Sequence, residues 1–137
     1  MNSLGGSIAL ETYEIEQFAA DRAINATGVT NAVSVSETGI LISVGIYKSV
    51  AWTGSPTMNL EIQVDGGTTK SINICNTNAS FHADTGPYSV SDGSTVIALM
   101  FDMAGSRYQT SLRIGLNVTV AGSGGTARFF VVKGKKL

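Results

Sequence analysis

Apolar and polar residues alternate along much of this chain, with the period of two that a half-buried β-strand produces. The clearest run is LRIGLNVTV, where every second residue is apolar: Leu112, Ile114, Leu116, Val118 and Val120. A second run, MNLEIQV, is followed by DGG and then by KSINI. Glycine carries no steric penalty at positive φ, so this spacing predicts a hairpin over residues 58–74 with Gly66 or Gly67 in the turn.

The same pattern, broken by Gly, Pro, Asn and Asp, predicts strands along the rest of the chain. The expected ranges are 7–18, 29–36, 39–50, 88–90, 94–103, 110–120 and 126–133. Residues 19–28 predict a short helical turn or an irregular connection. Eight or nine strands with almost no helical period favour an all-β fold, an antiparallel two-sheet sandwich of the jelly-roll kind. We expect one domain over residues 1–137, with 1–28 as a partly extended N-terminal arm.

Two strands are apolar on both faces, VIALMF at 96–101 and FFVV at 129–132. A sandwich strand needs only one buried face, so the second must be covered by a loop, the N-terminal arm or another subunit. We weigh the arm and a second copy equally on this ground. The second copy predicts a homo-oligomer, with an interface at Ile97, Leu99, Phe101, Phe129 and Phe130.

Charged residues make up only 14% of the chain, against about 25% in an average soluble domain. Glycine, serine, threonine and asparagine take their place on the expected surface, as is frequent in extracellular and virion proteins. The net charge of −1 argues against nucleic-acid binding, which needs a basic stripe. No apolar run is long enough for a membrane span, and the N-terminus lacks the pattern of a secretory signal, so we expect synthesis in a cytoplasm.

Catalytic side chains are scarce. His82 is the only histidine, and a hydrolytic set could combine it only with Asp84 or Asp92 and a serine, or with Cys75. Cys75 ends a strand and is expected to pack as a small apolar residue. The loop residues Asp84, Asp92 and Asp102 lack the spacing of a calcium loop. We therefore predict a protein that is not an enzyme, with no metal and no cofactor.

Carbohydrate binding is the remaining type of site. Trp52 lies beside a loop rich in Ser and Thr, and Tyr47, Tyr88 and Tyr108 lie near other strand ends. Such rings can stack on sugars, so these four residues are the candidate ligand site. In the alternative interpretation, Trp52 closes the end of the sandwich and binds no ligand.

Two family resemblances add to these patterns. VGIYK, LEIQVDGG and SDGSTVIALMF resemble the trimeric jelly rolls of the tumour-necrosis-factor and C1q type. GILISV, IQVDGG and SLRIGLNV resemble small structural proteins of tailed bacteriophages, namely capsid decoration proteins and tail or fibre tips. The chain departs from fibres in having no collagen-like or coiled-coil stem.

The phage resemblance implies a virion structural protein, a capsid decoration or tail/fibre accessory component, made in the host cytoplasm and located in the virion. Its implied partners are other virion proteins and further copies of itself, with a trimer favoured by both resemblances. The acidic residues Glu11, Glu14 and Glu16 could pair between subunits with Lys133, Lys135 and Lys136. The alternative function is a carbohydrate-binding module that uses Trp52 to hold a host-surface glycan.

Overall fold

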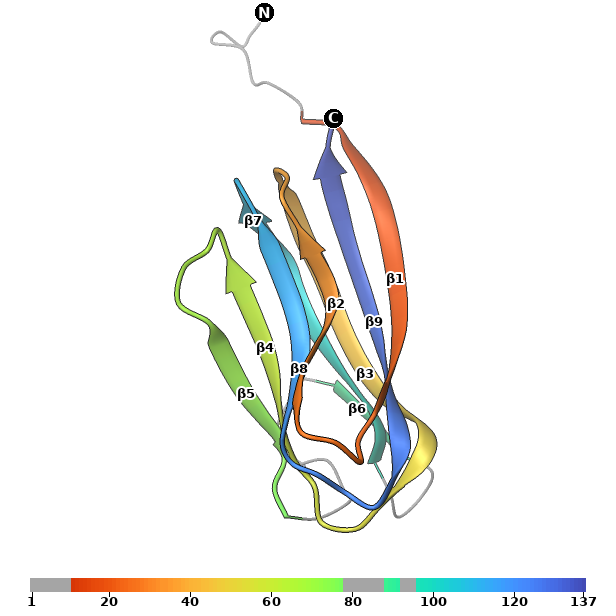
Figure 1. Ribbon diagram of the computed structural model, residues 1–137. Coiled ribbons are helices and arrows are strands. Elements are labelled where there is room, and N and C mark those ends of the chain that lie inside the picture. The colour runs from red at the N-terminus through yellow and green to blue at the C-terminus, as the bar shows by residue number, and fades with distance from the viewer. Residues whose placement is uncertain (1–10, 78–87, 92–95) are drawn as a thin grey trace, which may run out of the picture.

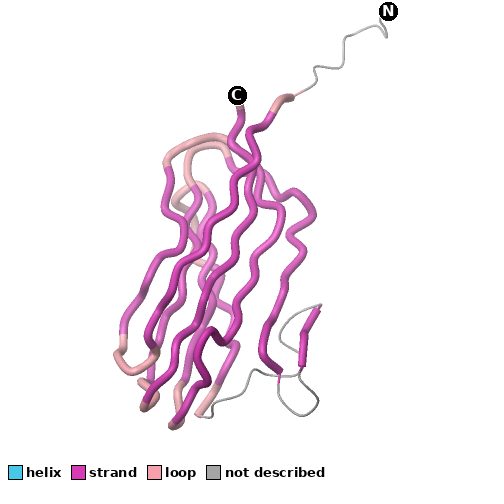
Figure 2. Tube along the Cα trace, turned by 90° about the vertical axis from the view of Figure 1, so that its right-hand side faces the viewer, coloured by secondary structure: helices cyan, strands magenta, loops and turns pink. Residues whose placement is uncertain are grey.

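The computed structural model describes residues 11–77, 88–91 and 96–137, and within these ranges every regular element is a β-strand (Figures 1 and 2). None of the described residues forms a helix that could cross a membrane. The strands, in chain order, are β1 (Tyr13–Ala23), β2 (Gly28–Val35), β3 (Gly39–Thr53), β4 (Thr57–Val64), β5 (Lys70–Cys75), β6 (Tyr88–Ser91), β7 (Val96–Tyr108), β8 (Leu112–Val120) and β9 (Gly124–Lys136).

The strands form two antiparallel sheets (Figure 1). One sheet has five strands in the order β1-β9-β3-β7-β6, and the other has four in the order β2-β8-β4-β5. The chain changes sheets at each step from β1 to β4 and again from β7 to β9, while β4–β5 and β6–β7 stay within one sheet. This is the strand order of a jelly roll with β6 added at one edge, so the fold expected from the sequence is confirmed.

The core lies between the two sheets and follows the period of two. On β8 the apolar residues from Leu112 to Val118 are buried at every second position, while Arg113 and Asn117 are partly exposed. On β9 the buried series begins at Ala127 and continues through Phe129 and Val131. Cys75 is buried in this core, as expected, and its thiol donates a hydrogen bond to the Pro56 carbonyl over 3.4 Å.

The turn after β4 has the geometry that its sequence predicts. Asp65 and Gly66 both have positive φ, at 55° and 66°, and the Gly67 amide donates to the Val64 carbonyl over 3.0 Å. Of the two candidate glycines, Gly66 therefore holds the positive-φ position. The Asp65 carboxylate ties this turn to the β7–β8 loop, because its Oδ1 accepts from the amides of Gln109, Thr110 and Ser111 at 2.8, 2.7 and 3.1 Å.

Several strand boundaries differ from the sequence-based expectation, among them the ends of β1, β3 and β7. β1 runs from Tyr13 through Ala23, so much of a stretch expected as a helical turn or connection is strand; residues 7–10 of the expected first strand lie outside the described residues. The register of β1 with β9 explains this, because Tyr13 to Ala23 pair one by one with Lys136 to Thr126. β3 continues to Thr53, and β7 to Tyr108 across residues expected to form a loop. In each case long-range pairing overrides the local turn signal.

Candidate functional site

The outer surface of the five-stranded sheet carries an apolar patch. Phe130 and Val132 alternate with the buried Phe129 and Val131, so their side chains point away from the core. Direct partners in an antiparallel ladder share a face, and the register places residues of β1 and β3 beside them. We call this patch the apolar face. It consists of Ile15, Ala19, Ile40, Phe130 and Val132, and it is divided by the polar Gln17 and Ser43, the direct partners of Val132.

Small residues shape the apolar face. Ala19 and Gly45 flank Phe130 on the two neighbouring strands. Gly134 lies between Ile15 and Ile40, because a Cβ on Gly134 would lie 3.2 Å from Ile15 Cδ1 and 3.0 Å from Ile40 Cγ1. Ile15 keeps 55% of its surface exposed in the single chain. The patch therefore combines the exposed Ile15 with the partly buried ring of Phe130.

The outer surface of the four-stranded sheet is mostly polar, although Val29 keeps 47% of its surface exposed there, and Arg113 lies at its centre. The Arg113 guanidinium donates to Gln63, Glu61, Asn31 and Thr69 over 3.1 to 3.2 Å. We call this arrangement the Arg113 network. Asn117 extends it by donating to the other Glu61 oxygen over 3.1 Å. These hydrogen bonds cross β2, β4 and β8, so the network ties strands together without an apolar contact.

A buried ammonium group lies at one end of the sandwich. Lys133 follows the inward series of β9 and is completely buried. Its Nζ contacts Glu16 on β1 and Glu37 in the β2–β3 turn, the latter at 2.5 Å, and lies 5.3 Å from the centre of the Phe18 ring. Tyr108, also buried, donates its hydroxyl proton to Glu37 over 3.0 Å. The cluster closes this end of the core, and the charge of the buried Lys133 ammonium is paired with the carboxylates of Glu16 and Glu37.

The protonation of the cluster follows from these contacts. Burial would raise the pKa of Glu37, but the hydrogen bonds from Lys133 and Tyr108 outweigh it and hold that pKa below its usual value. Burial acts against the charged form of Lys133, yet the two carboxylates raise its pKa. Burial and Glu37 raise the pKa of the Tyr108 hydroxyl, which stays protonated. At neutral pH the ammonium and Glu37 are both charged.

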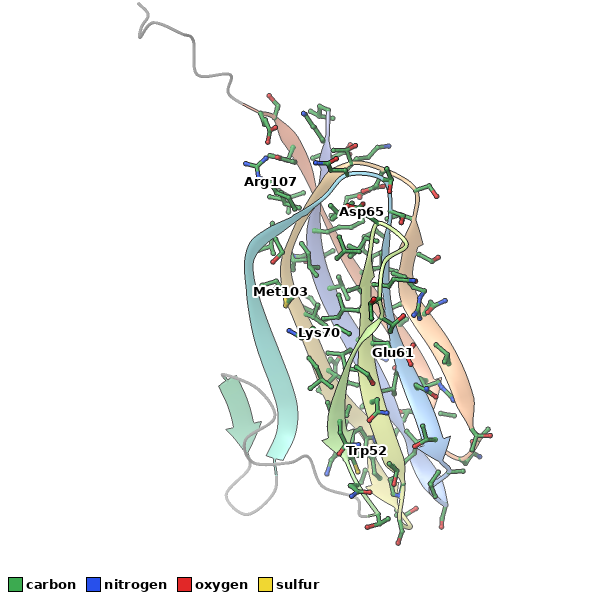
Figure 3. All side chains as sticks on the ribbon, turned by 90° about the vertical axis from the view of Figure 1, so that its left-hand side faces the viewer. Trp52, Glu61, Asp65, Lys70, Met103 and Arg107 are labelled. Carbon is green, nitrogen blue, oxygen red and sulfur yellow. The ribbon has the colours of Figure 1, made fainter. Side chains whose placement is uncertain are left out.

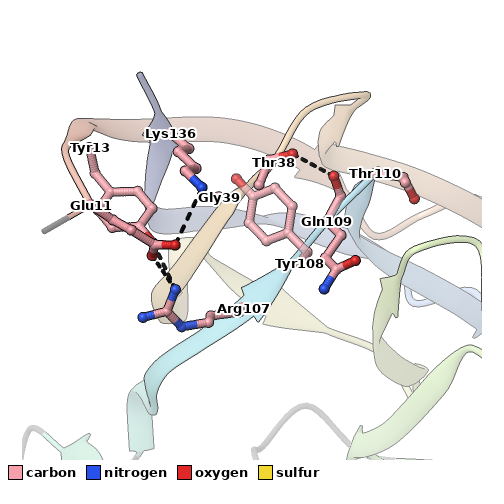
Figure 4. Close-up of a pocket in the computed structure, with 9 residues that line it drawn as sticks. All are labelled: Glu11, Tyr13, Thr38, Gly39, Arg107, Tyr108, Gln109, Thr110 and Lys136. Atoms are coloured by element: carbon pink, nitrogen blue, oxygen red, sulfur yellow. Dashed lines mark hydrogen bonds and ion pairs between the residues drawn. The ribbon is translucent and has the colours of Figure 1, made fainter. Parts of the chain in front are cut away.

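A polar pocket of about 330 Å³ lies at the same end of the molecule (Figure 4). Its lining residues are Glu11, Tyr13, Thr38, Gly39, Arg107, Tyr108, Gln109, Thr110 and Lys136. The Glu11 carboxylate contacts Arg107 and Lys136, the latter at 3.3 Å, and accepts from the Tyr13 hydroxyl. The hydrogen bond from Tyr13 and those from the two cations lower the pKa of Glu11 to about 2. The pocket therefore holds an ionised carboxylate.

The aromatic residues predicted to bind a ligand are not equally accessible. Trp52 is 5% exposed and donates from its ring nitrogen to the Thr126 carbonyl over 2.9 Å, at the end of the sandwich opposite Asp65 and Arg107 (Figure 3). Tyr108 is buried under the pocket, and Tyr47 is partly buried, with the Arg128 guanidinium 6.0 Å from its ring centre. The side chain of Tyr88 lies outside the described residues. Glycan binding stays a prediction, and the burial of Trp52 matches the alternative in which it closes the sandwich.

The five predicted interface residues divide between the two sides of the sheet. Phe129 is fully buried in the core, so it stabilises the single chain instead of meeting a partner. Phe130 belongs to the apolar face. In β7, Leu99 and Phe101 pair through the backbone with Ile46 and Val44, and the side chains of these two and of Ile97 lie outside the described residues.

The residues weighed for catalysis or metal binding lie mostly beyond the described ranges. His82, Asp84 and Asp92 fall in undescribed segments, and the side chain of Asp102 is not described. Within the described part of the chain, histidine, cysteine and acidic residues form no group of three that could hold a metal ion. The acidic residue Glu11 pairs with Lys136, and Glu16 with Lys133, inside one chain. Pairing between subunits stays a prediction.

Sequence reasoning missed the buried role of Lys133 and the Arg113 network. Lys133 continues the inward series of Ala127, Phe129 and Val131, so the period of two already placed it on the core side. The sequence suggested Glu16 as a partner of Lys133 between subunits, but their pairing within one chain could not be found in the same way, because the two residues are 117 positions apart. Arg113 lies on the outward positions of β8, where a lone arginine in a sequence carries no sign of its partners.

In sequence comparisons, the chain matches no protein-family model and none of the curated proteins. Its fold is similar to that of a chain in the acidic stable capsid structure of Helicobacter pylori bacteriophage KHP30, with a TM-score of 0.58, 13% identity and coverage of 91% of each chain. A chain of the cyanophage Pam1 capsid asymmetric unit has a TM-score of 0.44 and 14% identity, with 98% of this chain and 97% of that one covered.

An infectious bursal disease virus chain gives a TM-score of 0.43 at 8% identity, and the match covers all of this chain and 36% of that one. Of these three chains, the KHP30 chain alone has a TM-score above 0.5, so only its likeness bears on the structure. It shows a shared fold.

Proposed function

We propose that this protein is a structural component of a virion that acts through protein–protein assembly. The observation that carries the proposal is the shared fold with a KHP30 capsid chain, over 91% of each chain. The sequence resemblance to small phage structural proteins and the low charge content support it independently. The proposal places the protein in the virion, with other virion proteins as its partners.

Within the virion, we assign the protein to the capsid, as an accessory or decoration subunit, and not to the tail. Equal coverage of the two chains means that the KHP30 capsid chain has nearly the same length as this one. A tail or fibre position is the competing outcome of the experiment below.

The apolar face is the proposed contact surface. Complete burial of an apolar side chain of this size contributes about 1.5–3 kcal/mol, and the face offers several such residues on adjacent strands. The Arg113 network, whose polar groups already bond to one another, would remain toward solvent. Contact between apolar faces would make the protein a homo-oligomer, and the family resemblances favour a trimer.

The experiment uses a tagged copy incorporated into particles, with electron microscopy to locate the tag. Light scattering coupled to size exclusion at micromolar protein measures the mass in solution. Phe130→Asp should reduce both particle binding and self-association, because it places a charge in the apolar contact. Thr119→Asp is the matched control on an exposed position of β8 and should behave as the parent does.

Density for the tag on the capsid surface supports the decoration role, while density on the tail overturns that assignment. A parent protein that runs as a 14.2 kDa monomer and binds no part of the particle contradicts the assembly function. Equal effects of the two aspartate variants would contradict the choice of surface.

A further inference from the structure

The pocket at the end of the sandwich already contains one carboxylate, and its surroundings are built from separate parts of the chain. Glu11 precedes β1, Arg107 lies near the end of β7, and Lys136 ends β9. The two cations and the Tyr13 hydroxyl converge on the Glu11 oxygens (Figure 4). With one carboxylate and two cations, the pocket carries a formal charge of +1.

Glu11 does not use all the donors that the pocket offers. Arg107 contacts Glu11 and the Tyr13 oxygen through Nη1, and its Nε and Nη2 have no hydrogen-bond partner among the described residues. The Gln109 side-chain amide likewise has no partner within the described part of the chain. The Arg107 side chain is 67% exposed and that of Lys136 41%, so a ligand from solvent can reach both.

Another carboxylate could replace that of Glu11 in its contacts with Arg107 and Lys136. The Glu11 carboxylate belongs to a residue outside the strand ladder, and its contacts with Arg107 and Lys136 are ion pairs at the surface. An incoming carboxylate could make the same contacts, with the planar guanidinium providing two parallel N–H donors. We propose that the pocket is a carboxylate-binding site for an acidic side chain of a partner protein, and that Glu11 occupies it in the isolated chain.

An acidic protein segment fits the pocket better than an acidic sugar. Glu11, one of the lining residues, already pairs with Arg107 and Lys136, which shows that a glutamate carboxylate can contact both cations. Sugar rings commonly stack on an exposed aromatic face, and of the two tyrosines that line the pocket Tyr108 is buried and Tyr13 is partly buried. This inference does not depend on the virion role, because it concerns the recognition chemistry of one site.

The test removes the internal occupant and supplies an external one. Glu11→Gln keeps the size of the side chain but raises the formal charge of the pocket to +2. Glutarate is the probe for a glutamate side chain, followed by an N-acetylated, C-amidated Gly-Glu-Gly peptide. We expect both probes to bind Glu11→Gln at least tenfold more tightly than the parent, as measured by calorimetry and by NMR shifts of the Arg107 side chain.

Two further variants identify the cation responsible. Adding Arg107→Gln to Glu11→Gln should abolish the gain in affinity. Adding Arg128→Gln instead should leave the gain intact, because Arg128 pairs with Asp21 and does not line the pocket. Thermal unfolding and amide NMR spectra establish that each variant is folded, and a variant that fails this check is replaced by the corresponding alanine substitution.

Equal affinity of the parent and Glu11→Gln for glutarate would overturn the inference, as would a gain that survives Arg107→Gln. Glucuronate binding at least tenfold more tightly than both glutarate and the peptide would overturn the protein partner and assign the pocket to acidic sugars.

Discussion

The outer surfaces of the two sheets differ in how they use the same strand geometry. On the four-stranded sheet the outward positions are mostly polar, with Val29 as an exposed exception, and Arg113 bonds to acceptors on three other segments. On the five-stranded sheet the outward positions include Ile15, Phe130 and Val132. A two-layer sandwich needs one apolar face per sheet, and the four-stranded sheet meets that requirement with little surplus. The five-stranded sheet has apolar residues on its outer surface as well, and the stability of one chain does not explain them.

The largest expected effect separates the two sides of the five-stranded sheet. Phe129→Ala should reduce the free energy of unfolding by about 3–5 kcal/mol, because it leaves a cavity in the core. Phe130→Ala, one residue along, should cost less than about 1 kcal/mol in the monomer. Chemical denaturation measures both, at a concentration where light scattering detects no association. Equal losses would mean that Phe130 is part of the folded core and that the apolar face is not surplus.

A second prediction concerns the cluster that closes the core. Lys133→Met removes the ammonium between two carboxylates and should cost about 3 kcal/mol at pH 7, because the partly buried Glu37 loses its charged partner. The double variant Lys133→Met with Glu37→Gln should recover part of this loss. Urea denaturation of the three proteins measures the difference. A single variant as stable as the parent would mean that the charges contribute nothing to closing the sandwich.

The same cluster predicts a pH dependence with a definite sign. The folded-state pKa of Glu37 is lowered, so its contribution to stability is present above the unfolded-state pKa, about 4.3 for glutamate, and is lost as pH falls through the folded value. Stability of the parent should therefore decrease below about pH 4.5 more steeply than that of the double variant. Parallel curves for the two proteins would exclude Glu37 as a contributor.

The smallest expected effect tests the polar surface. Arg113→Leu should cost about 1–2 kcal/mol, since Glu61 and Gln63 lose hydrogen bonds in a partly buried position. Arg113→Lys should fall between the leucine variant and the parent, because an ammonium group cannot reach four acceptors arranged around a planar fork. Neither variant should change self-association. Altered mass in solution would show that the four-stranded sheet also takes part in assembly.

The fold could be predicted from the sequence wherever a local pattern of residues was enough to identify a strand or a turn. The alternation from Leu112 to Val118 placed the inner face of β8, and Asp65-Gly66 placed a turn, because both signals are local. The limits of β1 could not be obtained in this way. Its polar sequence has a weak pattern, and its extent depends on pairing with β9, more than a hundred residues away.

The candidate site was less predictable for the same reason. Phe129 and Phe130 are equally apolar, and only the register of β9 assigns one to the core and the other to the surface. In the sequence, Trp52 has the residue type of a ligand-binding ring. Its hydrogen bond to the Thr126 carbonyl could not be predicted, because Thr126 lies on a strand 74 residues later. The pocket combines Glu11, Arg107 and Lys136, whose proximity exists only after β1, β7 and β9 have joined one sheet.

The edge position of β1 has a consequence for how the molecule opens. β1 bonds to a single neighbour and has no fully buried side chain, although ion pairs from Glu16 and Asp21 hold it to β9. Elements with few buried contacts are the first to separate in local unfolding, so β1 amides should exchange with deuterium sooner than those of β3 and β9. When β1 separates, the backbone N–H and C=O groups on that edge of β9 are exposed. Another extended segment could then form β-sheet hydrogen bonds with them. The ion pairs of Glu16 and Asp21 therefore stabilise the paired state of β1 and lower the frequency at which the edge of β9 becomes exposed.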